Sequence, residues 1–268
     1  MQKAQVDHSE AINKSSPVPR YYQLAEWIRG QIQGGELKPG EQLPSERELS
    51  ERSGVSRMTI RQALARLARD GTVVVEHGVG TFVAEPKLAY DTLHLLGFTE
   101  EMIRLGGGVE SRVLAQVLVR EPVNVDEALH LEAREKVIKM VRLRLSEATP
   151  LVLETIYVSA RQCPALERKD LGAQSLYAIM EHQYRLRLKF ARQTIEAVTA
   201  DEFQSELFGV EPGAPMILLE GVTYSDRDAP VEAFKVLYRG DRFKFELESW
   251  RETAHATSAM PKVSMLMI

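Results

Sequence analysis

Residues 43–71 read LPSERELSERSGVSRMTIRQALARLARDG, and this stretch decides the fold of the first part of the chain. Ser45 and Glu48 have the spacing of a capping box, in which each side chain bonds the backbone of the other at the start of a helix. Gly54 tolerates the left-handed conformation of a tight turn, and Ser56 can then cap a further helix. The stretch therefore predicts a short helix, a sharp turn and a longer helix.

The longer helix has two different faces. Five arginines and no acidic residue fall between Arg52 and Arg69, although the net charge of the whole chain is −4. The apolar residues of this helix share its other face: Ile60, Ala63, Leu64, Leu67 and Ala68. An arginine-rich face is either a solvated surface or, in a nucleic-acid-binding protein, a surface that contacts phosphates and guanines.

The segments on either side extend the pattern. Residues 22–34 carry apolar side chains at helical spacing and end in a glycine pair, which predicts a first helix. Beyond Gly71, the runs TVVVE and TFVA are separated by HGVG, which predicts a β-hairpin. Three helices with a tight turn between the last two, followed by a hairpin, predict a winged helix-turn-helix, mainly α with a β wing.

This region resembles the DNA-binding domain of the GntR family of transcription regulators. The segments LPSERELSE, GVSRMTIRQAL and GVGTFV carry the resemblance, which covers residues 19–84. It implies a recognition helix in the major groove of an operator and a hairpin tip in the minor groove. The residues that it implies at the DNA are Ser45, Arg47, Arg57, Thr59, Arg61 and Gly78. Arginine suits this role because its planar fork matches the O6 and N7 atoms of guanine.

Length and composition bound the remaining possibilities. The 268 residues allow two domains, since a domain usually takes about 100 to 200 residues. We expect domains at 17–85 and 86–250, joined at the polar, proline-containing segment 84–87, and a tail at 251–268. The single cysteine, Cys163, excludes an intramolecular disulfide and fits a reducing cytoplasm. No apolar stretch approaches the ~20 residues of a membrane helix, so we expect no membrane contact.

The second part of the chain alternates long β-rich runs with short helical runs. Strands are expected at 113–119, 137–146, 151–159, 186–198, 216–224 and 231–238. Helices are expected at 99–105, 126–131, 175–184 and 201–207. Short connections such as 225–230 imply antiparallel pairing, so the second domain is predicted to be α+β with an antiparallel sheet.

This arrangement resembles UTRA, the effector-binding domain of the HutC subfamily of GntR regulators, whose fold is like that of chorismate lyase. The matching pieces are FTEEM, VRLRLSEATPLVLETIYV, SLYAIM, EPGAPMILLEGVTYS and EAFKVLYRGDRFKF, between residues 95 and 246. The resemblance implies a sensor of small molecules.

Four charged residues in the predicted strands are candidates for a ligand site. Arg142 and Arg144 must point to one face of their strand, about 6.6 Å apart, and two such arginines suit a phosphate or a carboxylate. Glu154 and Glu232 fall among apolar neighbours, where a charge is costly unless it is paired. If the sheet brings these faces together, the four residues form a polar ligand site. Structural ion pairs, or a solvated face for the arginines, are the alternatives.

The UTRA resemblance assigns a role to each of these residues. It implies that a ligand's anionic group lies at Arg142, Arg144, Ser175 and Tyr177, beside the loop that contains Phe98 and Thr99. It implies that sugar hydroxyl or amino groups lie at Glu154, Glu232 and Tyr238. Family members often carry serine at the position of Gly97, so one hydroxyl contact is missing here.

Taken together, the sequence predicts a homodimeric repressor that binds a palindromic double-stranded DNA operator. Its effector is expected to be a small anionic metabolite, either a phosphorylated sugar or amino sugar, or a carboxylate. We expect no metal and no cofactor. The alternative is a lyase-like enzyme that uses the second domain, but no nucleophile–base pair or metal-ligand cluster appears at useful spacing.

Overall fold

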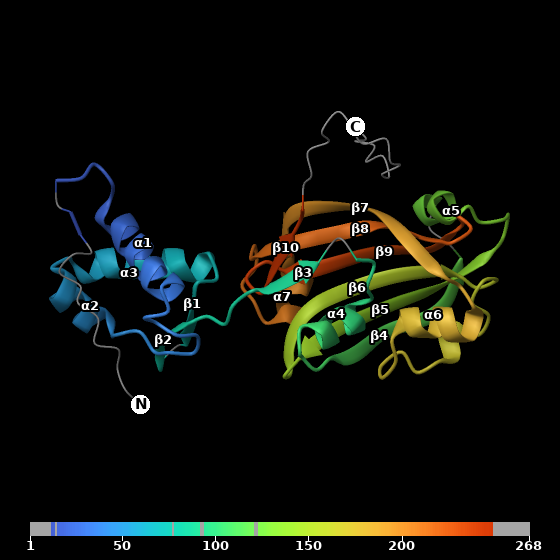
Figure 1. Cartoon of the computed structure of the whole chain (residues 1–268), viewed down its shortest axis with the longest axis horizontal. Coiled ribbons are helices and arrows are strands. Elements are labelled where there is room, and N and C mark those ends of the chain that lie inside the picture. Colours follow the sequence, from blue (N-terminus) through green and yellow to red (C-terminus); the bar gives the residue numbers. More distant parts are fainter. Residues whose placement is uncertain (1–11, 14, 77, 92–93, 121–122, 249–268) are drawn as a thin grey trace, which may run out of the picture.

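The computed structural model describes residues 12–13, 15–76, 78–91, 94–120 and 123–248. The expected tail at 251–268 lies outside these residues. Figure 1 shows a helical part with a small hairpin at one end of the molecule and a long curved sheet with its own helices at the other. Among the described residues, no helix combines the length and the apolar character needed to cross a membrane.

The N-terminal part is the predicted winged helix-turn-helix. Its elements are α1 (Arg20–Gln33), α2 (Glu46–Ser53), α3 (Arg57–Arg69), β1 (Val73–Glu76) and β2 (Gly80–Val83). The capping box at the start of α2 is present, since the Glu48 amide donates to Ser45 Oγ at 3.3 Å and the Ser45 amide donates to Glu48 Oε2 at 2.9 Å. Gly54 ends α2 with φ of 65°, and Ser56 caps α3. These local signals fix the turn between α2 and α3, and the buried faces of the three helices then form one core.

The C-terminal part is built on a six-stranded antiparallel sheet in the order β4-β5-β6-β9-β8-β7. Its strands are β4 (Glu110–Arg120), β5 (Lys136–Ser146), β6 (Thr149–Ser159), β7 (Leu188–Thr199), β8 (Pro215–Ser225) and β9 (Pro230–Arg239). All six predicted strands are present, with ends that differ from the predicted ones by at most three residues. The predicted α+β class with an antiparallel sheet is therefore correct.

Helices cover both faces of this sheet. They are α4 (Phe98–Arg104), α5 (Val123–Leu129), α6 (Leu176–Tyr184) and α7 (Glu202–Phe208), with a short 3₁₀ helix η1 (Leu166–Arg168). Ile138 and Met140 of β5 pack in one core with α6, whereas Leu143 and Leu145 of the same strand pack in another core with Phe208 of α7. Because side chains alternate along a strand, α6 and α7 lie on opposite faces. A ligand site on the α6 face is therefore separated from α7 by the sheet.

A second, two-stranded sheet was not predicted. Strands β3 (Leu88–Asp91) and β10 (Phe243–Glu246) pair in parallel, which brings the segment after 84–87 beside the last described strand. The Lys87 ammonium donates to the Gly240 carbonyl at 2.7 Å, and the Leu88 amide donates to the Arg242 carbonyl at 2.8 Å. The two strands lie more than 150 residues apart in the chain, and no local pattern in the sequence shows that they pair.

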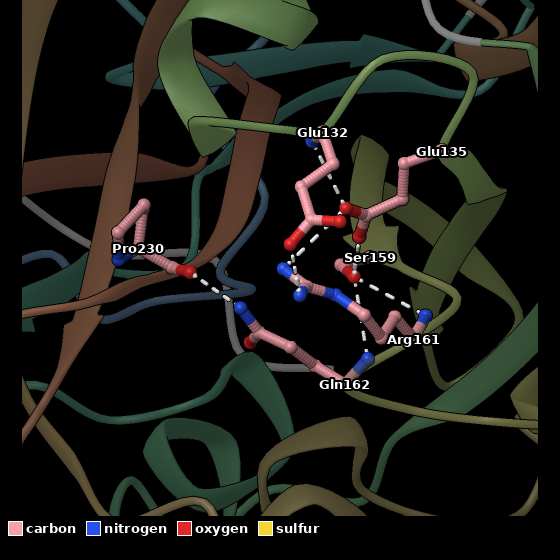
Figure 2. Close-up of polar contacts among 6 residues, drawn as sticks. All are labelled: Glu132, Glu135, Ser159, Arg161, Gln162 and Pro230. Carbon is pink, nitrogen blue, oxygen red and sulfur yellow. Dashed lines mark hydrogen bonds and ion pairs between the residues drawn. The ribbon is translucent and has the colours of Figure 1, made fainter.

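A polar network fixes the start of β9, the strand that carries Glu232 (Figure 2). The buried Ser159 hydroxyl at the end of β6 donates to Glu135 and accepts the amides of Arg161 and Gln162, each at 3.2 Å. The Gln162 side chain then donates to the carbonyl of Pro230 at 3.1 Å. Through these bonds, the end of β6 holds the first residue of β9.

Candidate functional site

The exposed side of α3 and the neighbouring turn of α2 present the predicted DNA-contacting arginines. Arg47 and Arg61 expose 69% and 64% of their side chains, and Arg57 is also exposed. The opposite side of α3, with Ile60 and Leu67, is fully buried. The helix is thus held by its apolar side while its guanidinium groups face solvent, as a helix that enters a major groove requires.

Arg61 is paired with an acidic residue that the sequence reasoning did not single out. Its Nε and Nη2 groups donate to the two carboxylate oxygens of Glu46, at 3.1 and 2.9 Å. This bond, more than any other cause, lowers the pKa of Glu46. No spacing rule in the sequence relates two residues on different helices, so the contact becomes visible only in the fold.

The other three predicted DNA residues occupy different settings. Ser45 is the N-cap of α2, and the Thr59 hydroxyl lies 2.9 Å from that of Ser56 at the start of α3. Both therefore also have structural roles in the turn motif. Gly78 lies exposed between β1 and β2 with φ of 76°, and open space surrounds it. Its place at the tip of the hairpin leaves room for a close approach of another molecule.

All nine residues predicted for the effector line one cavity of about 230 Å³ on the α6 face of the sheet. They come from α4, β5, β6, α6, β9 and the segment before α6: Phe98, Thr99, Arg142, Arg144, Glu154, Ser175, Tyr177, Glu232 and Tyr238. The pairing of β5 with β6 and of β6 with β9 brings them together, because it places their inward-facing side chains in adjacent rows.

Arg142 and Arg144 share one carboxylate in the lining of this cavity. Arg142 Nε lies 2.5 Å and Arg144 Nη1 lies 3.0 Å from the same Oε1 atom of Glu154. Arg142 also donates to the Leu171 carbonyl at 3.1 Å, and Arg144 donates to the Thr99 hydroxyl at 2.6 Å. The two arginines and the glutamate each expose 5% or less of their surface.

This cluster of Arg142, Arg144 and Glu154 has two cations and one anion. Burial is the largest influence on Arg144 and lowers its pKa. A buried group of charges with a net positive charge is costly unless a further anion compensates it. Glu232 interacts electrostatically with Arg142 but, with a pKa of about 7, is only partly ionised near neutral pH. The solvated-surface alternative for these arginines is therefore wrong, and the cluster can accept an anionic group.

A second polar cluster lies along the same face at β8 and β9. The Glu232 carboxylate accepts hydrogen bonds from the Thr223 hydroxyl at 2.8 Å and the Tyr177 hydroxyl at 2.9 Å. Burial raises the pKa of Glu232 to about 7, although the bonds from Thr223 and Tyr177 act in the opposite direction. Near neutral pH this carboxyl group can therefore either accept or donate a hydrogen bond.

Several residues at or beside the cavity were missed in the sequence. Thr223 does not line the cavity, but it lies directly opposite Glu232 in the β8–β9 register and hydrogen-bonds its carboxylate. Tyr90, which does line the cavity, comes from the unpredicted strand β3. Lys189 also lines the cavity, at the register shift between Leu188 and Phe190. The alternation of β8 would have placed Thr223 on the inner face, but only the strand pairing shows which residue it meets.

Gly97 has a physical reason for lacking a side chain. A Cβ atom at this position would lie 3.3 Å from the ring of Tyr177. The tyrosine ring thus packs directly against the backbone of the loop before α4. The position where family members often carry a serine hydroxyl is therefore packed against the ring of Tyr177 in this protein.

Comparison with known proteins accounts for both parts of the chain. Residues 20–83 match the family of bacterial regulatory proteins named gntR, and residues 104–244 match the UTRA domain. The transcriptional repressor NagR of Bacillus subtilis is 34% identical over 87% of this chain and 96% of its own length. A histidine utilization repressor of Pseudomonas putida is 32% identical over 86% of this chain and 92% of its own. The crystal structure of PhnF from Mycobacterium smegmatis matches 85% of this chain and 99% of its own, with a TM-score of 0.61 and 27% identity.

NagR and the histidine utilization repressor are named as repressors, and all three relatives match this chain over both its helix-turn-helix and its sheet domain. The lyase-like alternative is therefore not supported. The winged helix, the buried cluster of the second domain and the extent of the matches lead to one conclusion: the chain belongs to the GntR family, as a HutC-type transcriptional repressor with a UTRA effector domain.

Proposed function

We propose that this repressor binds a palindromic operator as a homodimer and releases it when a phosphorylated sugar or amino sugar occupies the cavity. Residues 17–85 form the DNA-binding domain in this proposal, and residues 86–250 form the effector domain. The observation that carries it is the buried cluster of Arg142, Arg144 and Glu154, which has one positive charge more than its negative charges. A phosphate group in contact with both arginines would compensate that charge.

The rest of the cavity supports a polyhydroxylated ligand. Glu232, Tyr177 and Thr223 form a hydrogen-bonded cluster of one carboxyl and two hydroxyl groups, which suits hydroxyl or amino groups of a ligand. Tyr238 and Phe98 are nearly buried and add apolar surface, on which the carbon face of a sugar ring can pack. A site that combines an anion-binding cluster with a hydroxyl-binding cluster matches a sugar phosphate better than a simple carboxylate.

The dimer is supported by the edge strand β4. It is the first strand in the order of the sheet, and Val113, Leu114, Val117 and Leu118 are each 38 to 45% exposed. Aliphatic side chains on an edge strand favour association, and a second subunit is the partner that a palindromic operator requires. Charged substitutions at Val117 and Leu118 should then convert a dimer into a monomer in sedimentation velocity measurements.

Repression would be relieved through different affinities of the effector for two arrangements of the DNA-binding domains. A coupling of about 1 to 3 kcal/mol, typical of allosteric proteins, would change operator affinity by roughly 5- to 150-fold. Residues 84–87 join the DNA-binding domain to β3, and Tyr90 on β3 lines the cavity.

A thermal-shift comparison of glucosamine 6-phosphate, glucose 6-phosphate, glucosamine and urocanate tests the proposal. A ligand that binds only the native state, at a concentration of about 100 times its Kd, stabilises the protein by about 2.7 kcal/mol. We expect the phosphorylated sugars to raise the melting temperature of the protein. At the same concentrations they should release the protein from an operator selected from a random duplex library. Stabilisation by urocanate alone would replace the phosphosugar with a carboxylate effector.

A further inference from the structure

The Glu46–Arg61 ion pair is a feature of the DNA-binding domain that its capping signals do not explain. It joins the first residue of α2 to the exposed face of α3, and neither side chain is buried. The start of α2 is already capped by Ser45 and Glu48. Glu46 is therefore not needed to cap α2, and both of its carboxylate oxygens accept hydrogen bonds from Arg61.

The geometry of the pair leaves one end of the guanidinium available. A guanidinium group has five N–H donors, and Glu46 takes one from Nε and one from Nη2. The two N–H groups of Nη1 and the second of Nη2 remain, and they point away from the carboxylate. Their end-on fork has the geometry that pairs with the O6 and N7 atoms of guanine.

We propose that Glu46 is a specificity-determining residue for DNA, which orients the end-on fork of Arg61 toward a guanine and offsets its positive charge. This inference rests on the proposed operator binding. A carboxylate at this distance weakens the attraction of Arg61 for phosphates at every DNA sequence, while the oriented hydrogen bonds to one base remain. The pair therefore reduces non-specific binding more than it reduces operator binding.

The other exposed arginines show that this arrangement is particular to Arg61. Arg47 is 3.8 Å from Glu51, too far for a hydrogen bond, and no ion pair of Arg57 is found within the described part of the chain. Glu51 and Glu46 attract these two arginines electrostatically, but no hydrogen bond within the described residues fixes the direction of either guanidinium group. Arg61 alone among the three is held by a two-point contact.

The test compares the full-length wild-type protein with Glu46→Gln, Glu46→Asp and the control Glu36→Gln. Glu36 is an exposed residue of the same domain, so its substitution removes one negative charge without touching Arg61. Wild-type protein first selects its operator from a random duplex library. All four proteins are then titrated with that operator and with a scrambled duplex of equal length at several salt concentrations.

We expect Glu46→Gln to bind the scrambled duplex several-fold more tightly than the wild type does. The slope of the logarithm of the binding constant against the logarithm of the salt concentration should become steeper by about 0.9, which corresponds to one more phosphate contact. The ratio of operator to scrambled affinity should fall about tenfold, as for the loss of one base contact. Glu46→Asp keeps the charge but shortens the side chain, so its ratio should fall with an unchanged slope. Glu36→Gln should leave the ratio unchanged.

Two results would overturn the inference. The first is that Glu46→Gln has the same ratio of operator affinity to scrambled-duplex affinity as the wild type, and the same salt dependence of binding. The second is an equal loss of affinity for both duplexes in Glu46→Gln and Glu46→Asp, together with a lower melting temperature, because the pair would then only hold α2 against α3. Failure of the wild-type protein to select any sequence would instead overturn the proposed operator binding, and this inference with it.

Discussion

Thr223 and Glu232 lie opposite each other on β8 and β9, and the Thr223 hydroxyl donates a 2.8 Å hydrogen bond to the buried Glu232 carboxylate. The hydroxyl of Tyr177 reaches the same oxygen from α6. A carboxyl group with two donors and a pKa near 7 makes the effector domain sensitive to pH.

The stability of the wild-type protein should therefore fall as pH rises from about 4.5 to 7. Burial raises the pKa of Glu232 from 4.5 to about 7, so the folded state holds this proton more tightly than the unfolded chain. Glu232 makes its full contribution to the free energy of unfolding below pH 4.5. This contribution is lost as the pH rises to 7, and it does not change further above pH 7. Its size is about 3 kcal/mol. Melting temperatures across this range should show a smaller pH dependence in Glu232→Gln, and an unchanged profile would contradict the assignment.

Replacing Glu154 with glutamine should strongly destabilise the effector domain. The change leaves Arg142 and Arg144 buried without their shared carboxylate, and breaking a buried ion pair costs about 3 to 5 kcal/mol. Denaturant titration measures the loss, with the exposed Glu196→Gln as control. Because the cavity gains positive charge, inorganic phosphate should stabilise Glu154→Gln more than wild type. An absence of this extra effect would argue against anion binding by the arginines.

Gly221→Ala should destabilise the sheet at the edge of the cavity. A Cβ atom at Gly221 would lie 2.2 Å from the Arg192 carbonyl oxygen and 2.8 Å from the Gln193 Cα atom. Strand β7 must then move away, at a cost of about 2 kcal/mol or more. Gly108→Ala, which meets no atom within 4 Å, is the matched control for chemical denaturation. Equal stability of the two variants would show that β7 adjusts freely.

Arg61→Ala should lose sequence-specific DNA binding while the effector domain stays folded. The removed base contact is worth about 1 to 3 kcal/mol of discrimination. Fluorescence anisotropy at fixed salt with operator and scrambled duplexes measures the effect, and Arg227→Ala in the exposed β8–β9 turn is the control. Wild-type operator affinity in Arg61→Ala would refute its place in the recognition surface.

Ser159→Ala should weaken the network that holds the start of β9. The substitution removes a donor to Glu135 and an acceptor of two backbone amides, so at least one buried group loses its partner. Such a loss costs about 1 to 3 kcal/mol. Unfolding in urea gives the size of the effect, and hydrogen exchange at Val231 and Glu232 should accelerate. Unchanged exchange there would mean that β9 is fixed by its neighbours in the sheet alone.

Local signals in the sequence were sufficient for the elements of the fold. Ser45, Glu48 and Gly54 act within a few residues of themselves, so capping and turn chemistry predicted α2, the turn and the start of α3 correctly. The alternation of β5 likewise predicted that Arg142 and Arg144 share a face, and both line the cavity. Resemblance to UTRA domains supplied Ser175 and Tyr177, which no periodicity marks.

The contacts that give these elements their chemistry were decided by the tertiary structure. Glu46 meets Arg61 because α2 and α3 pack together, and Thr223 meets Glu232 because β8 pairs with β9 in one register. Tyr90 reaches the cavity from a four-residue strand whose partner lies more than 150 positions away. Capping hydrogen bonds and side-chain periodicity involve residues a few positions apart, so they can be predicted from the sequence. The register between distant strands depends on the free energy of the whole packed sheet, and no short segment contains it.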